Sequence, residues 1–190
     1  MRSRGARTIV ALALLLALLV ASTLAAAAGL EGKKAPPLAA KGTDGKPVPL
    51  ATLAAGRPVI VVFWASWCPY CEALLPHLAK LQSAAGKERA AVIAVSVWED
   101  AGVKADAVLK ERGFDFISIP KGDKQAKPWG VKGTPGLFVV DRSGKVVYDR
   151  NARVLKAAGE AAPASSMNRK ATAAKSAEMW AADVKTALDA

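Results

Sequence analysis

The sequence predicts an α/β fold in which a central mixed β-sheet is flanked by helices and extended on its N-terminal side by a β-hairpin. First, short apolar runs rich in β-branched residues alternate along the chain with segments of helical apolar spacing. Second, the turn at Asp141–Gly144 lies between two such runs and predicts an antiparallel pair of strands. Third, 190 residues are enough for one domain whose core needs no disulfide.

The central elements follow from these patterns in chain order. Val59–Trp64 and Ala91–Val97 are continuous apolar runs, which are typical of buried strands. Helical spacing predicts a helix that begins at the cysteines and continues over Glu72–Leu81, kinked at Pro76, and a second helix over Val103–Arg112 with Val103 facing inward. The remaining elements are a weak strand, a strand and its returning partner, at Phe114–Ile119, Leu137–Val140 and Val146–Tyr148.

Segments at both ends of this core are predicted from turn and spacing signals. Thr43–Lys46 is a turn signal between the short apolar stretches of Leu38–Leu50, so we expect a small hairpin there. The alanine-rich segment that follows the last strand contains glycine and proline, and we expect residues 151–168 to be loosely ordered. Apolar residues at helical spacing then predict a final helix over about residues 170–189 that packs on the sheet: Ala173, Ala177, Trp180, Val184 and Leu188.

The N-terminal residues 1–28 have the order of a secretory signal. Three arginines precede an apolar run over Ile9–Val20, and small residues follow at Ala25–Gly29. We expect cleavage before a folded domain at residues 29–190. The alternative is a retained inner-membrane anchor over residues 9–28, a stretch just long enough to span a bilayer. Both alternatives place the folded domain outside the cytoplasm, in the periplasm.

The formal net charge of +11 indicates a basic surface. Export argues against a nucleic-acid partner, and the basic residues are scattered rather than clustered with aromatic ones. Four lysines that precede Pro135 form either a rim facing an acidic partner or a solvated face: Lys121, Lys124, Lys127 and Lys132.

The only two cysteines, Cys68 and Cys71, lie between a predicted strand and a predicted helix. This placement puts the sulfur of Cys68 at a helix N-terminus, where free backbone N–H groups and the helix dipole favour the thiolate. A thiolate three positions from a second thiol can break and form disulfides. The spacing therefore predicts a thiol–disulfide exchange site that needs no cofactor beyond the redox-active pair itself.

Two other interpretations of the cysteines are weaker. A purely structural disulfide between them would close a short loop and restrain the unfolded chain by only about 2 kcal/mol. A zinc site needs about four ligands, and His77 faces away from Cys71 on the same helix, so we expect no metal. His77 is expected to be a half-buried packing residue.

Several motifs in order resemble those of the thioredoxin superfamily and, more narrowly, of its exported TlpA/ResA-like branch. They are the hairpin segment Asp44–Leu50, the sequence FWASWCPYC ending at Cys71, Pro76 five residues later, and Gly133–Asp141. The similarity covers about Ala35–Asp149 and implies a thioredoxin-like fold.

The resemblance implies roles for individual residues near the cysteines. Cys68 would be the nucleophile near the surface, and Cys71 the more buried resolving thiol. Pro135 matches the cis-proline of these proteins, and the peptide of Thr134 would pair with the substrate backbone. Three further residues would shape the site, with the first covering it beside Cys68: Trp67, Pro69 and Tyr70.

Two acidic residues of the related proteins are missing. Val62 and Leu74 occupy the positions of acids thought to accept the proton of the buried cysteine. Water, Glu72 or Glu99 would have to serve instead. Asp100 is expected to cap the helix over Val103–Arg112.

The resemblance implies a periplasmic monomer that reduces disulfides in exported, cysteine-containing proteins, among them apocytochrome c during cytochrome c-type biogenesis. A membrane thiol reductase would supply its electrons. The reverse direction, an oxidase or isomerase, stays open, as does a binding or assembly protein that does not use the dithiol. A peroxidase is disfavoured because Ala65 stands where a threonine is expected.

Overall fold

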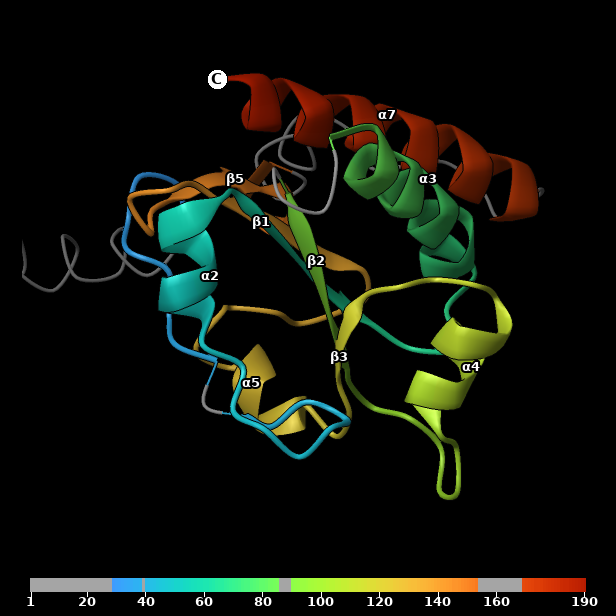
Figure 1. Ribbon diagram of the computed structural model, residues 1–190. Helices are drawn as coiled ribbons and strands as arrows, with labels where there is room; N and C mark the ends of the chain where they lie inside the picture. Colours follow the sequence, from blue (N-terminus) through green and yellow to red (C-terminus); the bar gives the residue numbers. More distant parts are fainter. Residues whose placement is uncertain (1–28, 39, 86–89, 154–168) are drawn as a thin grey trace, which may run out of the picture.

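A mixed five-stranded sheet forms the centre of the computed structural model, which describes residues 29–38, 40–85, 90–153 and 169–190 (Figure 1). The strand order is β3-β2-β1-β4-β5. The strands are β1 Val59–Trp64, β2 Ala91–Ser96, β3 Ile117–Ile119, β4 Gly136–Val140 and β5 Val146–Asp149. The first three run parallel, and β4 and β5 add antiparallel pairs, which confirms the predicted mixed sheet.

Helices cover both faces of this sheet. Their bounds are α2 Leu50–Gly56, α3 Pro69–Ala85, α4 Ala105–Glu111, α5 Asp123–Ala126 and α7 Arg169–Asp189. Helices α3, α4 and α7 pack on one face, and α2 and α5 contribute to the other. Helix α3 runs on through Pro76 to Ala85.

The side chains of β1 divide between two separate apolar clusters. Ile60 and Val62 belong to the cluster under α3 and α7, whereas Val59 and Val61 belong to the cluster under α2. Because successive side chains on a strand point to opposite faces, a strand covered on both sides needs apolar residues at every position. This explains the uninterrupted apolar run that predicted the strand.

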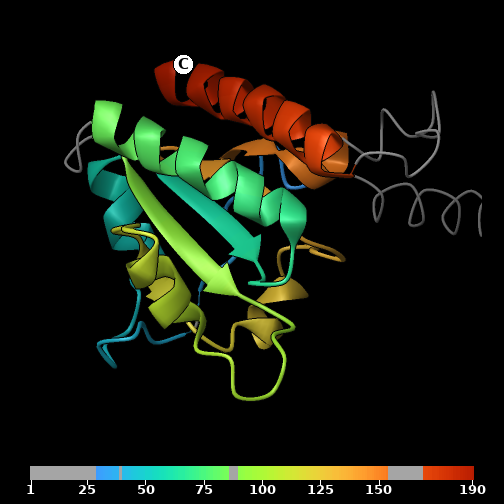
Figure 2. The same cartoon turned by 90° about the vertical axis from the view of Figure 1, so that its right-hand side faces the viewer.

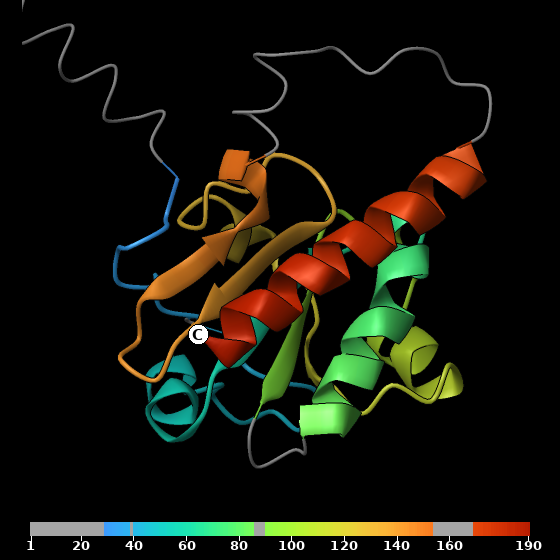
Figure 3. The ribbon, with the colours of Figure 1, turned by 90° about the horizontal axis from the view of Figure 1, so that it is seen from above.

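Helix α7 crosses the molecule beside α3 and over the antiparallel strands (Figures 2 and 3). It occupies the range of the final helix expected from the sequence. The positions predicted to face the protein are buried in the structure or packed against its core: Ala173, Ala177, Trp180, Val184 and Leu188. A helix from the far end of the chain therefore lies next to the helix that carries the cysteines.

The helix predicted over Val103–Arg112 begins later than expected. Helix α4 starts at Ala105, and Val103 is 40% exposed, so the prediction that Val103 faces inward is wrong. The predicted cap by Asp100 is also wrong, because the residue at the helix start is Lys104 and no side chain caps it. A backbone turn from Asp100 to Val103 precedes the helix and shifts its phase.

The segment before α2 covers both edges of the sheet. Backbone hydrogen bonds join Gly32 N to Val146 O beside β5, and Thr43 N to Ser118 O beside β3. The predicted hairpin is not confirmed as a pair of strands. An isolated bridge joins Lys41 and Pro47, and two backbone hydrogen bonds flank it, from Gly42 N to Lys46 O and from Val48 N to Ala40 O. The expected signal or anchor (1–28) and most of the segment expected to be loosely ordered (154–168) lie outside the described residues. Among the described residues, no helix is long and apolar enough to cross a membrane.

Candidate active site: a dithiol at the start of helix α3

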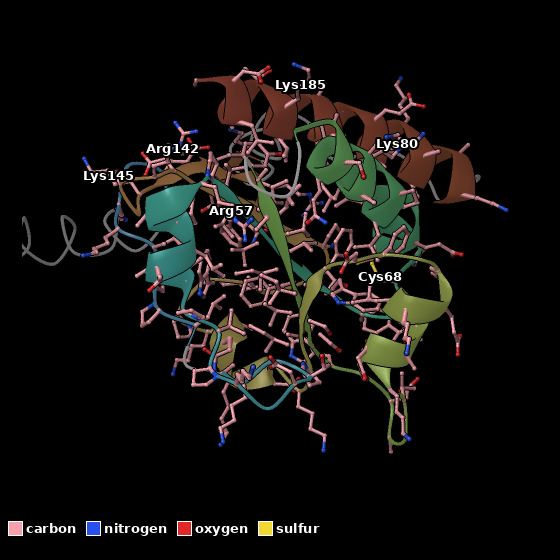
Figure 4. All side chains as sticks on the ribbon, viewed as in Figure 1. Arg57, Cys68, Lys80, Arg142, Lys145 and Lys185 are labelled. Atoms are coloured by element: carbon pink, nitrogen blue, oxygen red, sulfur yellow. The ribbon has the colours of Figure 1, made fainter. Side chains whose placement is uncertain are left out.

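Cys68 lies between the end of β1 and the start of α3, at the end of the sheet (Figure 4). Its carbonyl accepts the N–H of Glu72 at 3.0 Å, and its sulfur accepts the N–H of Cys71 at 3.2 Å. The side chain of Cys68 thus caps the helix in the way a serine or aspartate does elsewhere. Pro69 occupies the first helical position, where its missing N–H removes no helical bond.

The two sulfurs lie side by side in the interior of the protein. Both residues are free thiols, and Cys71 Sγ donates to Cys68 Sγ at 2.6 Å. Cys71 is fully buried, and Cys68 is 3% exposed. Cys68 is the less buried of the two, and its neighbours Trp67 and Pro69 are exposed.

The surroundings drive the proton affinities of the two thiols apart. Hydrogen bonds from the Cys71 thiol, the Thr134 hydroxyl and the backbone N–H groups at the helix start lower the pKa of Cys68 from 9.0 to about 6, against an opposing effect of burial. Burial raises the pKa of Cys71, and the neighbouring sulfur of Cys68 raises it further. Near neutral pH the pair is a thiolate at Cys68 and a neutral thiol at Cys71.

A cis peptide bond joins Thr134 and Pro135 in front of the dithiol. The Thr134 side chain lowers the pKa of both cysteines, and it is half-buried while Pro135 is buried. The loop before β4 therefore places a backbone segment beside the reactive sulfur, as the resemblance implied.

Three other expected site residues surround the cysteines in different ways. Trp67 is 53% exposed, and its Nε1 donates to the carbonyl of Trp98 at 2.8 Å, which fixes the indole at the rim. Pro69 is exposed, whereas Tyr70 is half-buried with its ring 6.1 Å from that of Trp180. Tyr70 thus connects the dithiol to α7.

Among the described residues, no carboxylate that contacts a cysteine sulfur replaces the missing acids. Val62 and Leu74 are fully buried in the cluster that contains Cys71. The side chain of Glu72 is 65% exposed and lies 3.6 Å from Arg112. Glu99 accepts hydrogen bonds from the backbone and hydroxyl of Ser66 at 2.9 and 2.6 Å, so its carboxylate supports the turn before Cys68. His77 is half-buried, as expected.

Sequence reasoning missed Arg150, which follows β5 immediately. Its Nη1 donates to the carbonyl of Pro135 at 2.7 Å, and its guanidinium lies 3.8 Å from the ring centroid of Trp180. The sequence offered no clear signal for this position, because β5 ends at Asp149 and strand alternation does not extend to Arg150. Within the described part of the chain, no group of three or more His, Cys, Asp or Glu side chains is arranged to hold a metal.

The fold and the site together define a CxxC dithiol protein with a thioredoxin-like fold, as the motifs indicated. The chain belongs to the Redoxin family, whose model matches residues 30–173. Among solved structures, a DsbE-type thiol:disulfide interchange protein from Chlorobium tepidum is similar with a TM-score of 0.56 and 29% identity, over 70% of this chain and 98% of that one.

Curated relatives carry names that agree with this family. Thiol-disulfide oxidoreductase ResA of Bacillus anthracis is 30% identical over 117 residues, covering 61% of this chain and 66% of the relative. Thiol:disulfide interchange protein HelX of Rhodobacter capsulatus is 34% identical over 125 residues, covering 62% and 66%. The chain thus spans just under two thirds of the length of these relatives.

Proposed function

We propose that the protein is a thiol:disulfide oxidoreductase that reduces disulfides in exported proteins through Cys68 and Cys71. The observation that carries the proposal is that the pKa of Cys68 is lowered and the pKa of Cys71 is raised, with both sulfurs beside the cis-proline loop. The thiolate of such a pair attacks, and the neutral thiol is held in reserve for the second step. The names of the ResA and HelX relatives support the same activity.

The reaction balances over two exchange steps. The Cys68 thiolate attacks one sulfur of the client disulfide, a mixed disulfide forms, and the other client sulfur leaves as a thiolate. Cys71 then loses its proton to a departing thiolate and attacks Cys68 Sγ, which releases the second client sulfur. The client gains two electrons and the protein ends as the Cys68–Cys71 disulfide, with no further cofactor.

Three surrounding residues would assist this exchange. The backbone at Thr134 and Pro135 would pair with an extended client segment beside Cys68, and Thr134 keeps the sulfur charged through its hydrogen bond. Trp67 would cover the mixed disulfide from the exposed rim.

The setting of this activity is proposed from the sequence. The arginine-rich start and apolar run of residues 1–28 support export to the periplasm, either as a cleaved protein or as one anchored through residues 9–28. The clients would be exported proteins with cysteine pairs, such as apocytochrome c, and a membrane thiol reductase would return the electrons. We expect a monomer that binds no nucleic acid.

An oxidase or isomerase is the second candidate, and the lowered pKa of Cys68 favours it. Stabilising the thiolate stabilises the reduced protein and makes its disulfide a stronger oxidant. The pKa of about 6 lies between the values of thioredoxin (about 7) and of the oxidase DsbA (about 3.5), and closer to the former.

The equilibrium redox potential against glutathione buffers separates the two directions. A value near that of thioredoxin, about −270 mV, supports the reductase, whereas a value near −120 mV supports the oxidase. Insulin reduction by the wild type, Cys68→Ser and Cys71→Ser tests the chemistry itself. We expect no turnover with either variant, and a trapped mixed disulfide only with Cys71→Ser. Full function of Cys68→Ser in client assembly would instead indicate a binding protein.

A further inference from the structure

Arg150 brings a positive charge to the buried side of the dithiol. It follows β5 and is half-buried between the loop of the cis-proline and helix α7. We propose that Arg150 is a positioning residue that favours the thiolate form of Cys68 and thereby sets the redox balance of the dithiol. This inference rests on the proposed function and assigns part of the site to Arg150, which lies just beyond the stretch Ala35–Asp149 whose motifs indicated the resemblance, although within the residues that the Redoxin model matches.

The guanidinium is fixed by two contacts at once. Its Nη1 donates to the carbonyl of Pro135 at 2.7 Å, and its plane lies over Trp180 with 3.8 Å from the guanidinium carbon to the ring centroid. The ring of Trp180 in turn lies 6.1 Å from that of Tyr70, the residue before Cys71. A planar cation with several donors can lie over a ring and donate to a carbonyl at the same time. A lysine does not reproduce this combination.

The other charged groups around the dithiol do not compete with Arg150 for this role. On the β2 side, Glu99 is bound by Ser66 and Ser96, and on α3 the exposed Glu72 lies near Arg112. On α7, Asp183 accepts from the Tyr148 hydroxyl at 3.3 Å, and Arg153 lies over the Tyr148 ring. Among the described residues, Arg150 is therefore the cation whose side chain donates to the loop carrying Thr134.

The interaction of Arg150 with the sulfurs has a definite sign. Burial lowers the pKa of Arg150, and attraction to Tyr148, Cys71, Cys68 and Tyr70 in their charged forms opposes this effect. The same attraction must favour the Cys68 thiolate, because a charge interaction is shared by both partners. Hydrogen bonds from Cys71 and Thr134 remain the larger influences on Cys68.

The effect of Arg150 on redox chemistry depends on whether the reduced or the oxidised protein carries the thiolate charge. Only the reduced protein holds a thiolate, so a nearby cation stabilises the reduced form relative to the disulfide. Removing the cation should make the dithiol more strongly reducing. Residue 150 would thus shift the redox potential of the dithiol and so influence whether the protein acts as a reductase or as an oxidase.

The test compares two substitutions of Arg150 that separate charge from hydrogen bonding. Arg150→Gln removes the charge but keeps a donor for the Pro135 carbonyl, and Arg150→Lys keeps the charge but loses the planar stack. We expect Arg150→Gln to raise the pKa of Cys68 by about half a unit to one unit, and Arg150→Lys to shift it less. The thiolate absorbance of the reduced protein, measured against pH, reports this value.

The second readout is the equilibrium with glutathione at neutral pH. A rise of this size in the pKa of Cys68 shifts the constant about two- to fivefold toward the disulfide form of the protein. Arg142→Met is the matched control, since Arg142 is exposed in the β4–β5 turn and well separated from Cys68 in Figure 4. We expect both readouts of this control to equal those of the wild type.

The outcomes separate the inference from the proposed function. If Arg150→Gln is folded and both readouts match the control, or if Arg150→Lys and Arg150→Gln shift them equally, the inference is wrong. Failure of the wild type to reduce or oxidise any disulfide substrate would overturn the proposed function instead. Should Arg150→Gln fail to fold, Arg150→Lys decides by itself: with the charge retained, a rise in the pKa of Cys68 of less than about half a unit supports the inference, and a rise of about one unit or more contradicts it.

Discussion

The dithiol is bordered by an acid on its β2 side and by a cation on its α7 side, and the two charges are held differently. Glu99 accepts three hydrogen bonds, from the backbone and hydroxyl of Ser66 and from the hydroxyl of Ser96. Arg150 bonds a carbonyl and stacks on Trp180. The hydrogen bonds from Ser66 and Ser96 hold the carboxylate of Glu99 in place. The guanidinium of Arg150 still acts electrostatically on the sulfurs.

This difference shows that closeness to a reactive sulfur does not define a residue's role. Glu99 has the chemistry of a proton acceptor, yet its hydrogen bonds commit it to supporting the turn that precedes Cys68. Arg150 cannot accept a proton, yet its charge favours the ionised thiol. The β2 side therefore supports the architecture of the site, and the α7 side adjusts its chemistry.

Trp180→Ala should have the largest effect, because it removes the buried ring on which Arg150 rests. Replacing a buried tryptophan by alanine typically costs about 3–5 kcal/mol of unfolding free energy, and Trp180 is buried between α3 and β5. Met179→Ala, on the exposed face of the same helix, should change stability by less than about 0.5 kcal/mol. Urea unfolding measures both. Equal effects of the two substitutions would mean that α7 does not support the site.

The next largest effect should be the change of the alkylation rate of Cys68 with pH. The rate at which iodoacetamide modifies the reduced protein should level off above the pKa of Cys68, about 6, and fall about tenfold per pH unit below it. Without the folded environment this pKa is 9.0. The thiolate therefore contributes its full stabilisation of the reduced folded protein above pH 9, and this contribution is lost as the pH falls through 6. An inflection near 9 would contradict the assignment of the thiolate.

Glu99→Ala should follow, with a cost in stability rather than in chemistry. It leaves the donors of Ser66 and Ser96 without their acceptor, which should lower the free energy of unfolding by about 2 kcal/mol. The pKa of Cys68 should stay near that of the wild type, with exposed Asp100→Ala as the control. A large shift of that pKa at unchanged stability would reverse the comparison between the two sides.

Glu72→Gln should have the smallest effect. The Glu72–Arg112 pair is separated by 3.6 Å and is substantially exposed, and such surface pairs contribute less than about 1 kcal/mol. We expect an unchanged rate of mixed-disulfide release in stopped-flow measurements. A marked slowing would show that Glu72 does receive the proton of Cys71.

The sequence predicted the central sheet and the dithiol well because both depend on local patterns. The cis bond before Pro135 was implied by the resemblance to related proteins, and it is present. The apolar run of β1 and the placement of Cys68 and Cys71 at the following helix were predicted from local patterns and agree with the structure. Each is a statement about neighbours in the chain, where strand and helix signals are strongest.

The features that the sequence did not predict depend on contacts between distant segments. Arg150 acquires its role only because it contacts two distant segments at once, the ring of Trp180 on α7 and the carbonyl of Pro135 in the loop before β4. The late start of α4 depends on the backbone turn after Asp100, for which the apolar spacing carries no signal. Helical spacing placed Trp180 on the buried face of α7 but did not say what it would contact.

The covered edges of the sheet have a consequence for a protein that would handle incompletely folded chains. Exposed strand edges recruit extended polypeptides and promote aggregation. Here Gly32 and Lys33 already pair with Val146 on one outer strand, and Thr43 pairs with Ser118 on the other. Under the proposed function, an unfolded client would therefore pair its backbone at Thr134 rather than along the sheet, and its attachment would end when the disulfide has been exchanged.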